Sequence, residues 1–250
     1  MFRSSNPAMR RLGTYQQEEI VKSASYKGIA VKSVYFIVLT IAAGLVTYLT
    51  ALILVDTNPG LLLGLLIGGP ILAFICSMVA IWVPRMTPYF GSVYAILQGL
   101  FLGAISAFFD SDTGGIVAAA LGATLCVFLI MAVLYATGLV RVGRFFRKFM
   151  MIALFSALLF SIIVGILSFI MPAVRTAFFG TGPLAIILCA VMIVLASLML
   201  LLDFDRMTKI VQNGMDKKYE WVCSFGLLIT LIWLFIEFLR LFAIIAARRR

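Results

Sequence analysis

Histidine is absent from this sequence, and charged residues and cysteines are scarce. Of the 250 residues, none is histidine, 12% are charged and four are cysteine. Without histidine, the chain lacks the most common general base and the most common metal ligand. GxSxG, HExxH and Walker motifs are also missing, and no two cysteines show the CxxC spacing of a zinc site. We therefore expect a protein that is not an enzyme and that holds no cofactor.

Apolar residues are abundant instead and make up 64% of the chain, well above their share in soluble domains. They fall into blocks of about 20 residues, the length that a helix needs to cross a bilayer about 30 Å thick. This pattern predicts an all-α, polytopic membrane bundle of seven transmembrane helices. The bundle forms one domain over residues 31–246, between a polar N-terminal segment (1–30) and a basic tail (247–250). The expected spans are Val31–Val55, Leu61–Val83, Tyr89–Phe109, Gly114–Leu139, Phe149–Met171, Pro183–Leu202 and Val222–Ala246.

The net charge of +10 resides at the ends of the apolar blocks rather than on one amphipathic face. We therefore expect contact with the lipid bilayer and not with nucleic acid. The N-terminal segment and the second, fourth and sixth loops are basic, whereas the first and third loops carry the acids Asp56, Asp110 and Asp112. The positive-inside rule then places the N-terminus in the cytoplasm. The tail Arg248–Arg250 would then lie on the opposite side. Either the number of spans is wrong by one and the last segment is re-entrant, or the more numerous basic residues of the cytoplasmic side outweigh the tail, and we favour the second alternative.

Ionisable side chains inside the expected spans are few, and each costs roughly 2.5–3.5 kcal/mol on insertion scales. Glu237 lies near the middle of the last span, and Arg240 follows one turn later on the same helix face. The two could form a helix-internal ion pair that only fixes packing. Alternatively, Glu237 is a titratable carboxylate that lines a polar path, and we favour this interpretation.

Asp203 and Asp205 end the sixth expected span at its cytoplasmic side. Asp205 is followed by Arg206 and is interpreted as a solvated charge at a helix end. Asp203 directly follows an unbroken apolar run and is the better candidate for a functional acid. Two carboxylates brought together in a low-dielectric site cannot both ionise cheaply, so Asp203 and Glu237 together would form a proton-controlled latch. Their oxygen atoms would also suit Ca²⁺, although two acids alone make a weak metal site.

Gln98 is an uncharged polar residue in the third expected span, directly before the Gly99-x-x-x-Gly103 pair. Small residues at this spacing let transmembrane helices pack closely. Gln98 therefore either forms a hydrogen bond across a helix interface or lines a pore.

Four stretches of the sequence carry a resemblance to a known family. They are Arg3–Met9 (RSSNPAM), Tyr94–Ser106 (YAILQGLFLGAIS), Leu201–Arg206 (LLDFDR) with the following Tyr219–Trp221, and Leu234–Phe242 (LFIEFLRLF). In these stretches the chain resembles the Bax inhibitor-like family, also called the transmembrane Bax inhibitor motif proteins, and in particular its bacterial branch. The resemblance implies a similar seven-helix fold over residues 30 to 246, in which the last helix is central and surrounded by the other six.

In that family an acid in the sixth helix and another in the seventh form a pH-sensing pair that gates a passive calcium leak. The matching positions here are Asp203 and Glu237, which are 34 positions apart, more than is usual in the family. The family usually has Asp in the last helix, and related bacterial sequences often carry Glu in place of Gln98. The resemblance thus implies a pH-modulated leak for Ca²⁺ or another cation in the bacterial cytoplasmic membrane, with Arg240 as a competing counter-charge.

Two other functions stay open at this point. The long basic N-terminal segment could bind a membrane quality-control protease, as some bacterial relatives are thought to do, and the protein would then be a regulator that transports nothing. A proton-coupled transporter of small solutes would need a broken helix near the membrane midplane, for which the sequence offers Pro70 and nearby glycines.

Overall fold

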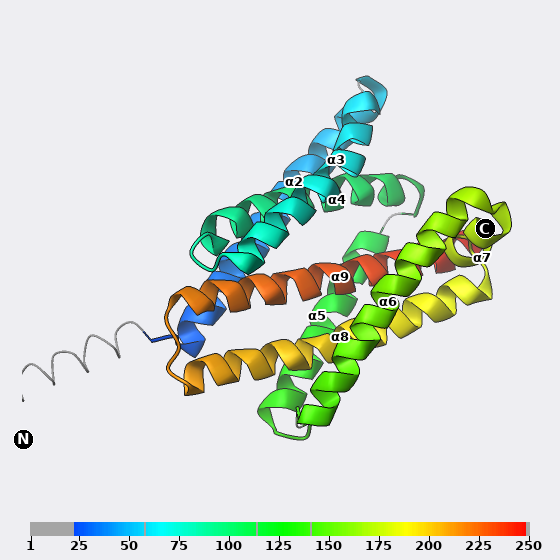
Figure 1. Cartoon of the computed structure of the whole chain (residues 1–250). Coiled ribbons are helices and arrows are strands. Elements are labelled where there is room, and N and C mark those ends of the chain that lie inside the picture. Colours follow the sequence, from blue (N-terminus) through cyan, green and yellow to red (C-terminus); the bar gives the residue numbers. More distant parts are fainter. Residues whose placement is uncertain (1–22, 58, 114, 141, 249–250) are drawn as a thin grey trace, which may run out of the picture.

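A computed structural model describes residues 23–57, 59–113, 115–140 and 142–248 of the chain (Figure 1). The segment before Ser23, which includes the resemblance stretch Arg3–Met9 and most of the polar N-terminal segment, lies outside the described residues, as do Arg249 and Arg250. The described residues form helices α2 (Tyr26–Thr57), α3 (Pro59–Trp82), α4 (Thr87–Thr113), α5 (Ile116–Ala136), α6 (Arg144–Ile170), α7 (Pro172–Phe179), α8 (Pro183–Gln212) and α9 (Lys218–Arg248).

Six of these helices are long and apolar enough to cross a membrane: α2, α4, α5, α6, α8 and α9. The second expected span corresponds to α3, whose described apolar part, Leu66–Trp82, is shorter than the others. The all-α membrane fold is confirmed, while the expected number of seven spans is not. Helix α3 continues through Pro70 without interruption, so the broken helix that a transporter would need is not present at this position.

Two boundaries differ from the sequence prediction in ways that matter for function. Helix α8 continues ten residues past the expected end at Leu202, and α9 begins at Lys218 instead of Val222. The sixth loop, which the expected spans place over residues 203–221, is therefore only a tight turn. In this turn Gly214 adopts a positive φ of 59°. The short helix α7 was not expected. It starts with Pro172, whose fixed φ and missing N–H suit the first position of a helix.

Helix α9 occupies the centre of the bundle. Figure 1 shows it between α2 and α4 on one side and α5 and α8 on the other, and it packs against all four. Helix α3 packs mainly on α4, and α6 packs on α7 and α8. The last helix is therefore central, but the other spans do not all surround it, because α3 and α6 pack mainly on other helices. Its two sides bury different clusters, one around Phe36, Phe225 and Phe235 and one around Leu200 and Leu234.

Glycines allow α2 and α4 to approach very closely. A Cβ atom at Gly103 would overlap the carbonyl oxygen of Gly44 and would lie 2.9 Å from the Cβ of Thr47. A Cβ at Gly99 would likewise overlap the carbonyl oxygen of Thr40. Both glycines belong to the pair identified in the sequence, and they hold α4 at a backbone-to-backbone distance that a side chain would prevent.

Basic segments that are far apart in the sequence meet at one end of the bundle. Ser23 forms an isolated antiparallel bridge with Asp216, so the start of α2 lies beside the α8–α9 turn. Arg147, in the first turn of α6, forms an ion pair with Asp205, in the last third of α8. The start of α2, the fourth loop before α6 and the sixth loop between α8 and α9 therefore lie on one side. This is the arrangement that the positive-inside rule requires.

Candidate functional site

Asp203 is buried at the interface between α8 and α9. The residue is 4% exposed and lies about 13 Å from the end of α8, well inside the helix rather than at its end. Its Oδ2 atom accepts a hydrogen bond of 2.6 Å from the hydroxyl group of Thr230 on α9. Its Oδ1 atom lies 3.9 Å from a guanidinium nitrogen of Arg206, one turn later on α8. Asp203 therefore links the two helices and carries a second oxygen that faces a cation.

Asp205 is also buried, so its interpretation as a solvated helix-end charge was wrong. Its Oδ2 atom accepts hydrogen bonds from Arg147 on α6, at 2.8 Å, and from Lys209 one turn later on α8. The reason is that α8 continues past Leu202, which places Asp205 against α6 instead of in a loop. Charge-assisted hydrogen bonds from two cations compensate the desolvation of this carboxylate.

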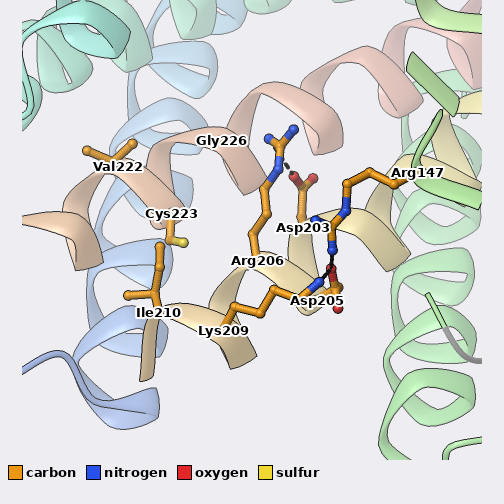
Figure 2. Close-up of a pocket in the computed structure, with 9 residues that line it drawn as sticks. All are labelled: Arg147, Asp203, Asp205, Arg206, Lys209, Ile210, Val222, Cys223 and Gly226. Carbon is orange, nitrogen blue, oxygen red and sulfur yellow. Dashed lines mark hydrogen bonds and ion pairs between the residues drawn. The ribbon is translucent and has the colours of Figure 1, made fainter. Parts of the chain in front are cut away.

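Both acids line an open pocket of about 250 Å³ (Figure 2). The three basic lining residues, Arg147, Arg206 and Lys209, have side chains that are about half exposed and are called its rim here. The other lining residues, called its wall, are Ile210, Val222, Cys223 and Gly226. Figure 2 shows the side chains of Arg147 and Lys209 converging on Asp205, while Arg206 extends beside Asp203. Because the rim residues belong to α6 and α8 and the wall to α8 and α9, the pocket lies where three helices meet.

Glu237 is also buried, farther along α9 than Thr230, and its carboxylate does not contact that of Asp203 in this structure. Glu237 is 8% exposed, and its Oε1 atom accepts a hydrogen bond of 3.3 Å from the indole of Trp233. Its Oε2 atom is buried and has no hydrogen-bond partner among the described residues. Thr230, the partner of Asp203, precedes Glu237 by two helical turns, or about 10 Å along α9. The two acids are therefore separate polar positions in this conformation.

Arg240 binds α7 and forms no ion pair with Glu237 in the part of the chain that the structure describes. Its guanidinium donates a hydrogen bond of 2.6 Å to the carbonyl oxygen of Phe178 and lies 5.3 Å from the ring centroid of Phe179. The helix-internal pair considered from the sequence is thus not formed here. Arg240 instead connects the far end of α9 to the short helix that follows α6.

Gln98 makes its hydrogen bond within α4, donating from Nε2 to the hydroxyl oxygen of Tyr94 at 3.3 Å. Its Oε1 atom is buried without a partner among the described residues. Tyr94 in turn packs edge-on against Phe225 of α9, with ring centroids 5.1 Å apart. The hydrogen bond across helices that the sequence suggested is absent from the described contacts.

Glu220 is a fully buried acid that the sequence argument did not identify. It lies in the first turn of α9, is 0% exposed and forms an ion pair with Lys32 of α2. Its Oε1 atom accepts a hydrogen bond of 2.8 Å from the backbone N–H of Ser25, and Lys32 lies 5.0 Å from the ring centroid of Trp221. An acid at a helix N-terminus is favoured by the helix dipole, which was the available signal.

The acidic side chains that the structure describes do not cluster into a metal site of three or more ligands. Among the described residues, no group of three or more Asp, Glu, Cys or His side chains converges on a point that could hold a metal ion. Asp203 and Asp205 share a pocket, but two basic side chains bind Oδ2 of Asp205, and Arg206 lies 3.9 Å from Oδ1 of Asp203. Any bound cation would have to displace these side chains.

Comparison with known proteins identifies the family. No curated protein matches the chain. Residues 6–247 match the family described as Bax inhibitor 1 like, which covers nearly the whole sequence and all of the described helices except the last residue of α9. The match confirms the resemblance seen in the four sequence stretches, and the apolar helices agree with it. This chain is therefore a multi-pass membrane protein that belongs to the Bax inhibitor 1 like family.

Proposed function

We propose that this protein is a passive, pH-modulated cation leak, with Ca²⁺ as the expected ion and Asp203 as the proton-sensitive group. The observation that supports it most strongly is the buried carboxylate of Asp203, which joins α8 to α9 through Thr230 and faces an open pocket. An intramembrane acid in such a position is characteristic of ion and proton pathways. The protein is proposed to lie in the bacterial cytoplasmic membrane with its basic end in the cytoplasm.

The proposed route follows the seam between α8 and α9. Thr230, Leu234, Glu237 and Leu241 share one stripe of α9, because they are spaced by three or four residues. Leu234 belongs to a buried cluster with Leu200 of α8, and both leucines are fully buried. The two acids thus lie on the same seam, with a leucine layer between them. In the proposed scheme this conformation is closed, because apolar side chains separate the polar positions.

Proton control follows from the charge of Asp203. When ionised, the carboxylate attracts a cation from the pocket, where it competes with Arg206. When protonated, the carboxyl group is neutral and can donate its proton in a hydrogen bond to the hydroxyl oxygen of Thr230. The threonine hydroxyl can then donate to the carbonyl oxygen of Gly226. Deprotonation is therefore expected to favour flux. In this scheme Glu237 is a second acid along the route, and the latch does not require contact between the two acids.

Asp203→Asn tests the proposal. Ca²⁺ flux into proteoliposomes of the purified protein is expected to rise several-fold between about pH 6 and about pH 8, and the variant should lose this rise because its amide cannot titrate. Asp216→Asn, which neutralises an exposed acid in the α8–α9 turn, serves as the control and should keep the full pH response. Unchanged pH dependence in Asp203→Asn, or liposomes that stay tight at every pH, would refute the proposed function.

Leu234→Ala tests the leucine layer. Truncation of this fully buried side chain removes apolar atoms between Asp203 and Glu237, and we expect a several-fold higher basal flux at low pH. The same cavity should lower the free energy of unfolding by about 2–5 kcal/mol. Leu228→Ala is a matched control, because Leu228 is buried in the cluster on the other side of α9. If both variants raise the flux equally, the effect is general loosening and not a gate on this seam.

A further inference from the structure

We propose that the pocket between α6, α8 and α9 is a binding site for a phosphate group, supplied by the headgroup of an anionic lipid or by free phosphate. The site lies in the pocket that Asp203 faces, but the proposal does not require that the protein conducts. It rests on the chemistry of the rim formed by Arg147, Arg206 and Lys209, on the size of the pocket and on its place at the basic end of the bundle.

The basic side chains at the rim carry more hydrogen-bond donors than the described residues have acceptors for them. A guanidinium group carries five N–H donors and an ammonium group three. Arg147 and Lys209 each donate one hydrogen bond, and both bonds go to the same oxygen of Asp205. Arg206 approaches Asp203 at 3.9 Å, which is too long for a hydrogen bond. Most of these donors therefore remain available to a ligand with several acceptor oxygens.

The charge balance of the pocket also favours an anion. Its lining carries three positive side chains and two carboxylates, and the carboxylate side chains are largely buried while the basic side chains are about half exposed. An anion at the mouth would meet the cations first. Two guanidinium groups in one pocket suit phosphate particularly well, because each planar fork can donate two parallel hydrogen bonds to its oxygens. The volume of about 250 Å³ far exceeds the roughly 30 Å³ that one water molecule occupies in the liquid.

The position of α6 makes the rim accessible from the bilayer. Only 11% of its most apolar stretch is buried, against 44% for α9. Phe145 and Phe149, on the same turns as Arg147, are 85% and 52% exposed. A lipid whose headgroup reached Arg147 could therefore lay its acyl chains along these side chains. Anionic headgroups concentrate on the cytoplasmic leaflet, where the basic end of this bundle is proposed to lie.

The key variant is Arg206→Gln. Arg206 forms no hydrogen bond among the described residues, so its replacement should leave the fold intact, which thermal unfolding in detergent will verify. Titration of the purified protein with phosphatidylglycerol, followed by native mass spectrometry, measures binding of the lipid. We expect the variant to raise the apparent Kd about tenfold, the typical worth of one charge-assisted hydrogen bond. Arg144→Gln, which removes an exposed charge of α6 outside the pocket, should change the Kd less than about twofold.

Inorganic phosphate distinguishes the two sources of the ligand. If phosphatidylglycerol binds through Arg206 and millimolar phosphate does not displace it, the site is a lipid site. If phosphate binds and stabilises the wild-type protein but not Arg206→Gln, and the lipid shows no such dependence, the site takes free phosphate. Equal binding by wild type and Arg206→Gln, equal losses in Arg206→Gln and Arg144→Gln, or no binding of either probe would overturn the proposal.

Discussion

Glu220→Ala is expected to lower the free energy of unfolding by about 3–5 kcal/mol, among the largest effects of any single substitution in this chain. The variant leaves the ammonium group of Lys32, whose side chain is only 12% exposed, without its carboxylate partner. It also removes the acceptor for the backbone N–H of Ser25, at the start of α2. A reversible SDS titration of the protein in mixed micelles measures the loss.

Two further variants show whether the effect belongs to the buried pair. Lys32→Met combined with Glu220→Leu replaces both charges by apolar side chains and should recover much of the lost stability, because no isolated charge remains. Asp216→Asn breaks an exposed ion pair with Lys218, only a few residues away, and should cause no measurable change. If Glu220→Ala costs no more than Asp216→Asn, the pair contributes nothing specific to the contact between α2 and α9.

Gly103→Ala is expected to destabilise the bundle by about 3 kcal/mol, the upper end of the usual cost of overpacking. The added methyl group would overlap the carbonyl oxygen of Gly44 and press against Thr47. These atoms belong to the backbone and to a β-branched side chain, so they cannot move aside as the end of a flexible side chain would. Separation of α2 from α4 would then reduce the packing of Phe36 and Tyr94 against α9. The same SDS titration applies.

Gly122→Ala is the matched control for this prediction. Gly122 also lies within a helix, α5, but a Cβ atom there would have nothing within 4 Å. The substitution should be neutral or stabilising by up to about 1 kcal/mol, because alanine is the better helix former. Equal losses at positions 103 and 122 would mean that close approach of α2 and α4 does not explain the effect.

The sequence was sufficient to predict the membrane class and most helix positions, because apolar length is a strong and local signal. It also located the buried acid Asp203, which stands out at the end of an apolar run. Its failures came from contacts between distant segments. Arg147 and Asp205 are 58 positions apart and Lys32 and Glu220 are 188 apart, so no local pattern could show that either acid is paired and buried.

Helix ends were the other source of error. Charges such as Asp203, Asp205 and Arg206 normally indicate that a span is ending, and the prediction therefore stopped α8 at Leu202. In the continuing helix each acid has a basic residue three or four positions later, namely Arg206 and Lys209, and pairs at this spacing are compatible with a helix. The short helix α7 was missed because eight residues with one arginine give too little periodicity to recognise.

The central position of α9 has a consequence for biogenesis. The ribosome makes α9 after α2–α8, so the helices that will surround it enter the membrane before their shared neighbour exists. Until α9 arrives, Lys32 lacks Glu220, Asp203 lacks Thr230, and the aromatic side chain of Phe36 has no Phe225 to pack against. Insertion of one segment then satisfies these groups together. Insertion of α9 therefore completes the assembly of the bundle. If synthesis ended before α9, unpaired charges would remain for membrane quality control to detect.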